Sequence, residues 1–378
     1  MAEYLTNTTD LTKVASAIRE KGGTSDPLVY PDGFVTAIQA IQAGTELKII
    51  VTVSSGATVT ATKGSLSVSG TSVNGTCTLI VPEEGEWTVS ATLGGATSDS
   101  NIVNVTSLFD TSLVFVSATL NDNSWEAIRV ISDAGMGANY WSIGDRKAVT
   151  LNGTVGHLTL SNYTTYAFII GFNHNSSLEG ANRIHFQLAK TALSGGTDVC
   201  FCDSQYNVEA AIFGYFSINP FAENSGGWKS SQMRINICGT SLSNYAGTII
   251  AVIPETLRDV LKPVTKYTDN TAGGSGTEAS YVTATTDYFF LLSEFEVFGS
   301  TSFSNRNEAS KQAQYAYYSA GNSKIKYKHD ETSTAARWWL RSPFGSIFSN
   351  VFVLATDNGT SGYTRANYSL GFAPGFCV

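Results

Sequence analysis

Charged residues are scarce in this chain of 378 residues: they make up 14% of the composition, and the formal net charge is −8 at pH 7. Binding to the phosphates of nucleic acid requires clustered Lys and Arg, so this balance argues against a nucleic-acid partner. The one basic run extends from Lys324 to Lys328 and is interrupted by Ile325 and Tyr327. We expect it to form a solvated strand face.

Cysteines and long apolar runs are also scarce. The five cysteines are an odd number without regular spacing, which excludes a disulfide framework. Cys200 and Cys202 would share one face of a strand, but no second close pair of Cys or His completes a zinc site. We therefore expect buried free thiols, with no cofactor and no bound metal.

The chain also lacks the apolar stretch of ~20 residues that a membrane span needs. Residues 1–10 are polar and do not resemble a signal peptide. We expect no membrane insertion and synthesis as a soluble protein in a cytoplasm. With so few charges, the surface must consist largely of Ser, Thr, Asn, Gly and Tyr, which suits a β-rich, loop-rich exterior protein.

The first segment, residues 1–44, predicts two short helices, because apolar residues recur at helical spacing from Leu11 to Ile18 and from Phe34 to Ile41. Two such helices bury too little surface to be stable alone. Leu11 to Gly23, followed by the sequence from Tyr30 to Phe34, resembles the N-terminus of tail proteins in phages of Gram-positive bacteria. The resemblance implies a virion-attachment segment that contacts other tail proteins. An ordinary helical hairpin is the alternative.

The second segment, residues 45–107, predicts antiparallel strands. Apolar residues alternate with polar ones, as in Ile49, Val51 and Val53, and again from Trp87 to Ala91. Gly and Ser turns fall between the strands at the spacing of a β-sandwich. The segment resembles the small immunoglobulin-like modules of phage virions, which implies a spacer.

The third segment, residues 108–378, predicts an α+β domain, since a few helices stand among many short strands. One helix is expected from Pro254 to Lys262, and another begins at Ser293, which has the capping-box spacing to Glu296. The turn signal Asp357-Asn358-Gly359 predicts a hairpin that pairs residues 346–354 with residues 360–369.

Several motifs in this third segment carry a second resemblance. Leu291 to Glu296 resembles the strand-to-helix motif of C-type lectin folds of the formylglycine-generating-enzyme type. The motif Trp338 to Pro343 and the terminus Gly371 to Val378 are similar to a phage-associated domain of Firmicutes and their prophages, as are Asn139 to Asp145 and Gly171 to His174. The resemblance implies a C-type-lectin-like domain that binds a bacterial surface protein or glycan from a phage tail tip, often as a homotrimer.

Some members of that family are the variable proteins of diversity-generating retroelements, in which template adenines are randomised. A randomised AAC codon never encodes Lys, Glu, Gln, Met or Trp, and none of these occurs from Phe344 to Val378. A Gly- and Ser-rich β-region is also poor in Lys and Glu, so composition leaves both explanations open. We expect a variable region at residues 344–372.

The residue types of this region suit a binding surface, because Tyr supplies rigid contact area and small polar residues adapt their hydrogen bonds. We expect Trp338, Trp339 and the terminus Gly371 to Val378 to form the rigid frame beneath it. The candidate ligand contacts are Phe344, Ser346, Ile347, Ser349, Asn350, Thr356, Asp357, Ser361, Tyr363, Arg365, Tyr368 and Leu370.

Catalysis has weaker support. Formylglycine-generating chemistry depends on paired cysteines, and a glycan-cleaving enzyme needs paired carboxylates in a groove. Glu294 and Glu296 are better explained as helix-start residues, and His174 as a structural histidine. No Asp/Glu cluster forms a recognisable calcium loop. A prophage-encoded adhesin or an undiversified tail protein is the alternative, but secretion and anchoring signals are missing. We expect a virion protein that is not an enzyme.

Overall fold

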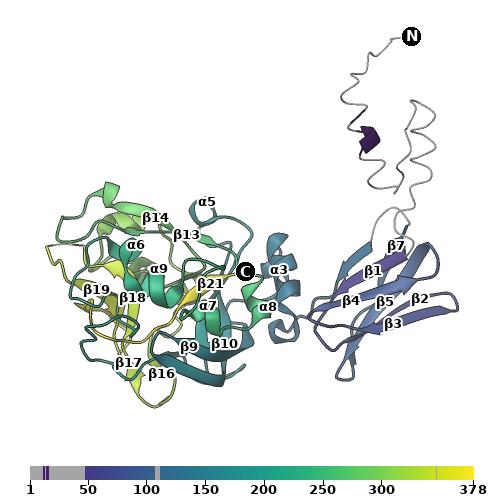
Figure 1. The fold of residues 1–378 in the computed structure, drawn as a ribbon, viewed down its shortest axis with the longest axis horizontal. Helices are drawn as coiled ribbons and strands as arrows, with labels where there is room; N and C mark the ends of the chain where they lie inside the picture. Colours follow the sequence, from purple (N-terminus) through teal and green to yellow (C-terminus); the bar gives the residue numbers. More distant parts are fainter. Residues whose placement is uncertain (1–11, 13, 17–46, 107–110, 346) are drawn as a thin grey trace, which may run out of the picture. The chain divides into compact units, whose positions relative to one another are not determined.

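The computed structural model describes residue 12 and residues 14–16, 47–106, 111–345 and 347–378. Residue 12 and residues 14–16 are helical, and the rest of the predicted attachment segment lies outside the described residues. The chain divides into two compact units, Met1–Phe115 and Val116–Val378 (Figure 1).

The first unit consists of strands that form two sheets, in the orders β4-β1-β8 and β3-β2-β5-β6, with β7 paired to β5. The strands are β1 (Leu47–Thr52), β2 (Thr58–Lys63), β3 (Leu66–Thr71), β4 (Thr76–Val81), β5 (Gly85–Leu93), β6 (Ala96–Thr97), β7 (Asn101–Val105) and β8 (Thr111–Val114).

Alternation explains this unit, since buried residues alternate with more exposed ones along β1, β4 and β5. These side chains form one core shared by both sheets, with Trp87 fully buried in it. The predicted strands are confirmed. The boundary lies after Phe115 rather than after residue 107, because β8 pairs in parallel with β1 and so belongs to the first unit.

The second unit mixes short helices with several small sheets, as the predicted α+β class requires. Its strands are β9 (Arg146–Val155), β10 (Leu158–Phe172), β11 (Ile184–Lys190), β12 (Val199–Cys200), β13 (Val264–Asp269), β14 (Val282–Asp287), β15 (Phe289–Phe290), β16 (Lys326–Lys328), β17 (Ala335–Ala336), β18 (Trp338–Pro343), β19 (Val351–Ala355), β20 (Ser361–Arg365) and β21 (Gly375–Cys377).

The helices of this unit are short. The α-helices are α3 (Trp125–Asp133), α4 (Gly137–Tyr140), α5 (Ser176–Glu179), α6 (Gly227–Ser230), α7 (Ile249–Val252), α8 (Glu255–Arg258), α9 (Glu294–Phe298) and α10 (Ala316–Ser319). Other helical turns are η1 (Leu120–Asp122), η2 (Met233–Cys238), η3 (Ala279–Tyr281) and η4 (Arg306–Ser310). The helix predicted from Pro254 to Lys262 is thus confined to α8. No helix among the described residues is long and apolar enough to cross a membrane.

The sheet with the most strands in the second unit has five, in the order β15-β21-β11-β10-β9. The last strand of the chain, β21, pairs with both β11 and β15. Every residue from Gly371 to Val378 is buried, which confirms the prediction that the terminus is part of the frame. All five cysteines are free and buried, as expected.

The middle of the basic run contradicts the prediction of a solvated strand face, whereas Lys324 and Lys328 are partly exposed. Lys326 is 1% exposed rather than solvated. Its Nζ lies 5.4 Å from the ring centre of Phe168 and 5.1 Å from that of Trp338. The ammonium of Lys326 is therefore stabilised in the interior because the rings of Phe168 and Trp338 lie close to it.

Candidate ligand-binding face

The predicted hairpin is present. It consists of β19 and β20, which belong to a three-stranded sheet in the order β18-β19-β20. β19 pairs with β20 from Val351–Arg365 to Ala355–Ser361. Gly359 has a φ of +80° in the connecting turn, and its N–H donates to the carbonyl of Thr356 at 3.0 Å. Glycine adopts this left-handed conformation without steric penalty, so the turn signal in the sequence correctly placed the reversal.

Beneath the hairpin lies the expected rigid frame. Trp338, Trp339 and Arg341 of β18 are all fully buried. The Nε1 of Trp338 donates to the carbonyl of Lys324 at 2.9 Å, and that of Trp339 donates to the carbonyl of Phe216 at 3.0 Å. β19 is buried on both faces, so we find no polar alternation along it. Among the three strands of this sheet, only β20 has residues exposed to solvent.

The outer face carries a cluster of aromatic rings, which we call the aromatic patch: Phe303, Phe344, Phe348 and Tyr363. The ring centre of Tyr363 lies 5.1 Å from that of Phe303 and 4.8 Å from that of Phe344. Phe344 in turn lies 5.1 Å from Phe348 in an edge-to-face contact. Tyr363 is 46% exposed and Phe348 is 44% exposed. The rings support one another and still leave large apolar area open to solvent.

Ten of the twelve predicted contact residues are exposed or half-buried. Ile347, Ser349, Asp357, Tyr363 and Arg365 are exposed, and Ile347 reaches 81%. The half-buried members are Phe344, Asn350, Thr356, Ser361 and Tyr368.

Two predicted contacts differ from the rest. Leu370 is fully buried in the main core, so its assignment as a contact is wrong. The reason is that the backbone N–H of Leu370 donates to the carbonyl of Phe216 at 3.0 Å, which draws this part of the chain inward. Ser346 lies outside the described residues.

Hydrogen bonds anchor the edges of this face to the frame. The hydroxyl of Ser361 donates to the buried carboxylate of Glu294 at 2.6 Å, and the same carboxylate accepts from the backbone N–H groups of Phe303 and Ser304. Asn224 donates from its Nδ2 to the carbonyl of Phe348 at 3.0 Å. Glu294 therefore connects β20 to the loop that supplies Phe303. Sequence analysis missed Phe303 and Asn224, since neither lies within the variable region.

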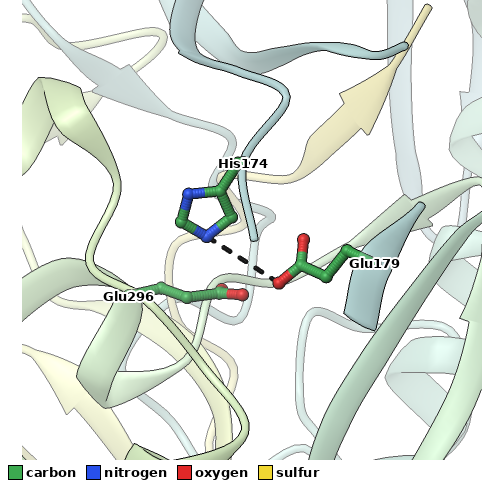
Figure 2. A group of neighbouring side chains, drawn as sticks. All are labelled: His174, Glu179 and Glu296. Carbon is green, nitrogen blue, oxygen red and sulfur yellow. Dashed lines mark ion pairs between the residues drawn. The ribbon is translucent and has the colours of Figure 1, made fainter. Parts of the chain in front are cut away.

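A second group of polar residues lies inside the unit (Figure 2). His174, Glu179 and Glu296 place potential ligand atoms within 4.8 Å of one another, and all three are buried. The Nε2 of His174 is 3.7 Å from a carboxylate oxygen of Glu179. His174 also stacks on the ring of Tyr315, with 3.7 Å between the ring centres.

Two cations already balance these carboxylates. The Nζ of Lys266 lies 2.6 Å from Glu179 and 3.0 Å from Glu296 and donates to the hydroxyl of Tyr315 at 2.7 Å. Arg341 contacts both carboxylate oxygens of Glu296. A divalent metal between the carboxylates would displace or repel the Lys266 ammonium, so the geometry favours a structural ion-pair network. The predicted absence of a metal stays a prediction.

Burial and neighbouring charges perturb the pKa values in this network. Burial raises the pKa of Glu179 to about 7. Burial also disfavours the ionised form of Glu296, but Arg341 and Lys266 overcome this and hold its pKa well below the usual range. Burial and the charge of Lys266 lower the pKa of His174 to about 3, so its imidazole is neutral. The capping box of α9 is present as predicted, with the Ser293 hydroxyl accepting from the N–H of Glu296 at 3.0 Å.

Residues 211–378 match the model of a family described as a domain of unknown function, DUF6273. The match includes β18 to β21 and the aromatic patch. No curated protein matches the chain.

Proposed function

We propose that this protein is a host-recognition protein of a phage tail tip, in which the aromatic patch and its exposed neighbours bind a bacterial surface ligand. In this proposal the second unit has a C-type-lectin-like fold, and the first unit is an immunoglobulin-like spacer. Residues 1–44 attach the protein to other tail proteins. The virion context follows from the sequence resemblance alone.

The observation that carries the proposal is a contrast in burial between β19 and the large side chains beside it. β19 is buried on both faces, whereas Ile347, Phe348 and Tyr363 expose large apolar side chains beside it. Exposed rings on a rigid support bind with little loss of side-chain entropy. Such rings are also the residues that most often dominate binding energy.

Binding is favoured over catalysis by the location of the chemically reactive groups. Glu179 and Glu296 are 2% exposed or less and are paired with Lys266 and Arg341. Substrate could not reach these carboxylates without unfolding the core. On the exposed face, the carboxylate of Glu209 forms an ion pair with Arg365 at 2.9 Å.

A diversified binding surface would also be consistent with this arrangement. Of the predicted variable region, the residues from Phe344 to Arg365 supply the exposed positions, whereas Leu370 and the residues after it are buried. We expect a natural repertoire to vary the exposed positions and to keep Leu370 apolar. Homotrimeric assembly would add avidity when a single contact is weak.

The test uses fluorescently labelled full-length protein and a panel of intact Gram-positive cells. We expect saturable binding to at least one strain. An Ile347→Ser/Tyr363→Ser variant should bind that strain at least about ten-fold more weakly, because losing one dominant contact removes about 1.4 kcal/mol or more.

Ile102→Ser is the matched control. Ile102 is 69% exposed and lies in the first unit, so the same Ile→Ser change at this position should leave cell binding unchanged. Equal binding by the wild type and the Ile347→Ser/Tyr363→Ser variant would refute the proposed site. Absence of binding to every strain in the panel would refute the proposed function.

A further inference from the structure

A cleft of about 400 Å³ lies in the second unit beside the tip of the β19–β20 hairpin. One wall is the loop between β11 and β12, with Thr197 and Asp198. The other wall is the segment around β16, with Ile325 and Tyr327. Its volume falls in the range of roughly 300–1,000 Å³ that small-molecule sites have.

Backbone contacts fix the two walls relative to each other. The N–H of Tyr327 donates to the carbonyl of Asp198 at 2.8 Å, and β12 pairs in parallel with β16. Strand alternation then places Ile325 and Tyr327 on the cleft side, while Lys326 is buried on the opposite side. The cleft is therefore part of the folded frame.

The cleft adjoins the tip of the hairpin that carries several predicted contact residues. A Cβ atom added to Gly359 would lie 3.0 Å from the Cγ1 of Ile325. Thr356 and Asp357 precede Gly359 in the same turn. A ligand that occupies the cleft could thus extend toward the exposed face.

Asp198 supplies the principal polar group of the cleft. Its carboxylate is ion-paired with Lys190, and it accepts from the hydroxyl of Tyr317 at 3.4 Å. The Asp198 side chain is 11% exposed, so a small part of it faces the cleft. Because Lys190 is only 4% exposed, the carboxylate is held in place from the interior side.

The remaining lining groups define the class of ligand. Ser323 and Thr332 contribute exposed hydroxyls, while Tyr327 and Ile325 contribute half-buried apolar surface. A pyranose ring has the complementary chemistry, since its hydroxyls donate to a carboxylate and its C–H groups pack on an aromatic ring.

We propose that this cleft binds a hexopyranose unit. The inference rests on the proposed function only for the source of the sugar, which would be a glycan of the bacterial surface. Asp198 accepts from one hydroxyl of the sugar, and Tyr327 packs against one face of the ring.

The experiment is saturation-transfer NMR on the full-length protein with methyl α-D-glucopyranoside, methyl β-D-galactopyranoside and N-acetyl-D-glucosamine as separate probes. At least one probe should receive saturation from the wild type. Ser323→Arg and Thr332→Arg fill the cleft from exposed positions and should each reduce that signal at least about ten-fold. Ser100→Arg, at an exposed position in the first unit, should retain it.

Absence of transfer to all three probes, or a signal that persists in either cleft variant, would overturn the inference. The Ile347→Ser/Tyr363→Ser variant separates this result from the proposed function. Retained sugar binding with lost cell binding would support both proposals. Cleft-dependent sugar binding together with unchanged cell binding by this variant would refute the proposed face and leave the sugar site intact.

Discussion

Replacing Lys266 by Met tests the buried ion-pair network that supports the frame. The Lys266 side chain is fully buried, and its ammonium contacts Glu179, Glu296 and the Tyr315 hydroxyl. The Lys266→Met variant would leave two buried carboxylates with Arg341 as their one cation. Removal of one partner from a buried ion pair costs about 3–5 kcal/mol, because an uncompensated charge remains.

The cost should depend on pH because Glu179 can become neutral. Its pKa in the folded protein is about 7, above the ordinary value of 4.5. A raised carboxyl pKa means that folding favours the protonated form, so this contribution is complete below about pH 4.5 and is lost as the pH rises through about 7. Loss of the Lys266 ammonium raises this pKa further. The destabilisation should therefore be small near pH 5 and larger near pH 8, where Glu179 of the wild type is ionised and paired with Lys266.

Urea unfolding of the full-length wild type and variant at these two pH values measures the effect. A Lys266→Met/Glu179→Gln double variant should recover part of the lost stability at the higher pH, since an amide carries no charge. A destabilisation that is equal at both pH values, or larger at the lower one, would refute the assignment of Glu179 as the group whose ionisation sets the pH dependence.

Three further predictions concern the hairpin and the thiols. Leu370→Ala should lower the free energy of unfolding, measured in urea, by about 2–5 kcal/mol. Tyr363→Ala should lower it by only about 1 kcal/mol. Equal losses would contradict the assignment of Leu370 to the buried frame and of Tyr363 to the exposed face. Gly359→Ala should destabilise the protein by about 1–2 kcal/mol, because φ is +80° and the new Cβ would contact Ile325, and a neutral effect on the thermal midpoint would exclude this strain. The five buried thiols should react with a thiol reagent only after unfolding, so rapid labelling of the native protein would show that a cysteine is accessible.

Local signals in the sequence predicted local structure well. Alternation identified β1 and β5 because each has one buried face and one polar face. Asp357-Asn358-Gly359 identified the hairpin turn, and Ser293 with Glu296 identified the start of α9. Each of these patterns depends on residues that are close together in the chain.

Features that depend on distant contacts could not be predicted in this way. Leu370 is buried because the strand-like terminus pairs with segments near Phe216. Lys326 is buried because Phe168 and Trp338 surround its ammonium. Neither arrangement leaves a periodic signal in the sequence.

The aromatic patch illustrates the same limit. The contact between Phe303 and Tyr363 depends on Glu294, which accepts hydrogen bonds from both segments. Composition indicated that residues 344–372 suit binding, but it could not show that Phe303 completes the patch.

Hydroxyl-radical footprinting of the full-length protein bound to the envelope of an adsorbing strain tests the central claim most directly. Oxidation of Phe344, Phe348 and Tyr363 should fall on binding, while oxidation of the exposed Ile80 and Ile102 in the first unit should not change. Unchanged oxidation of the three aromatic residues, with protection elsewhere in the bound protein, would contradict the account.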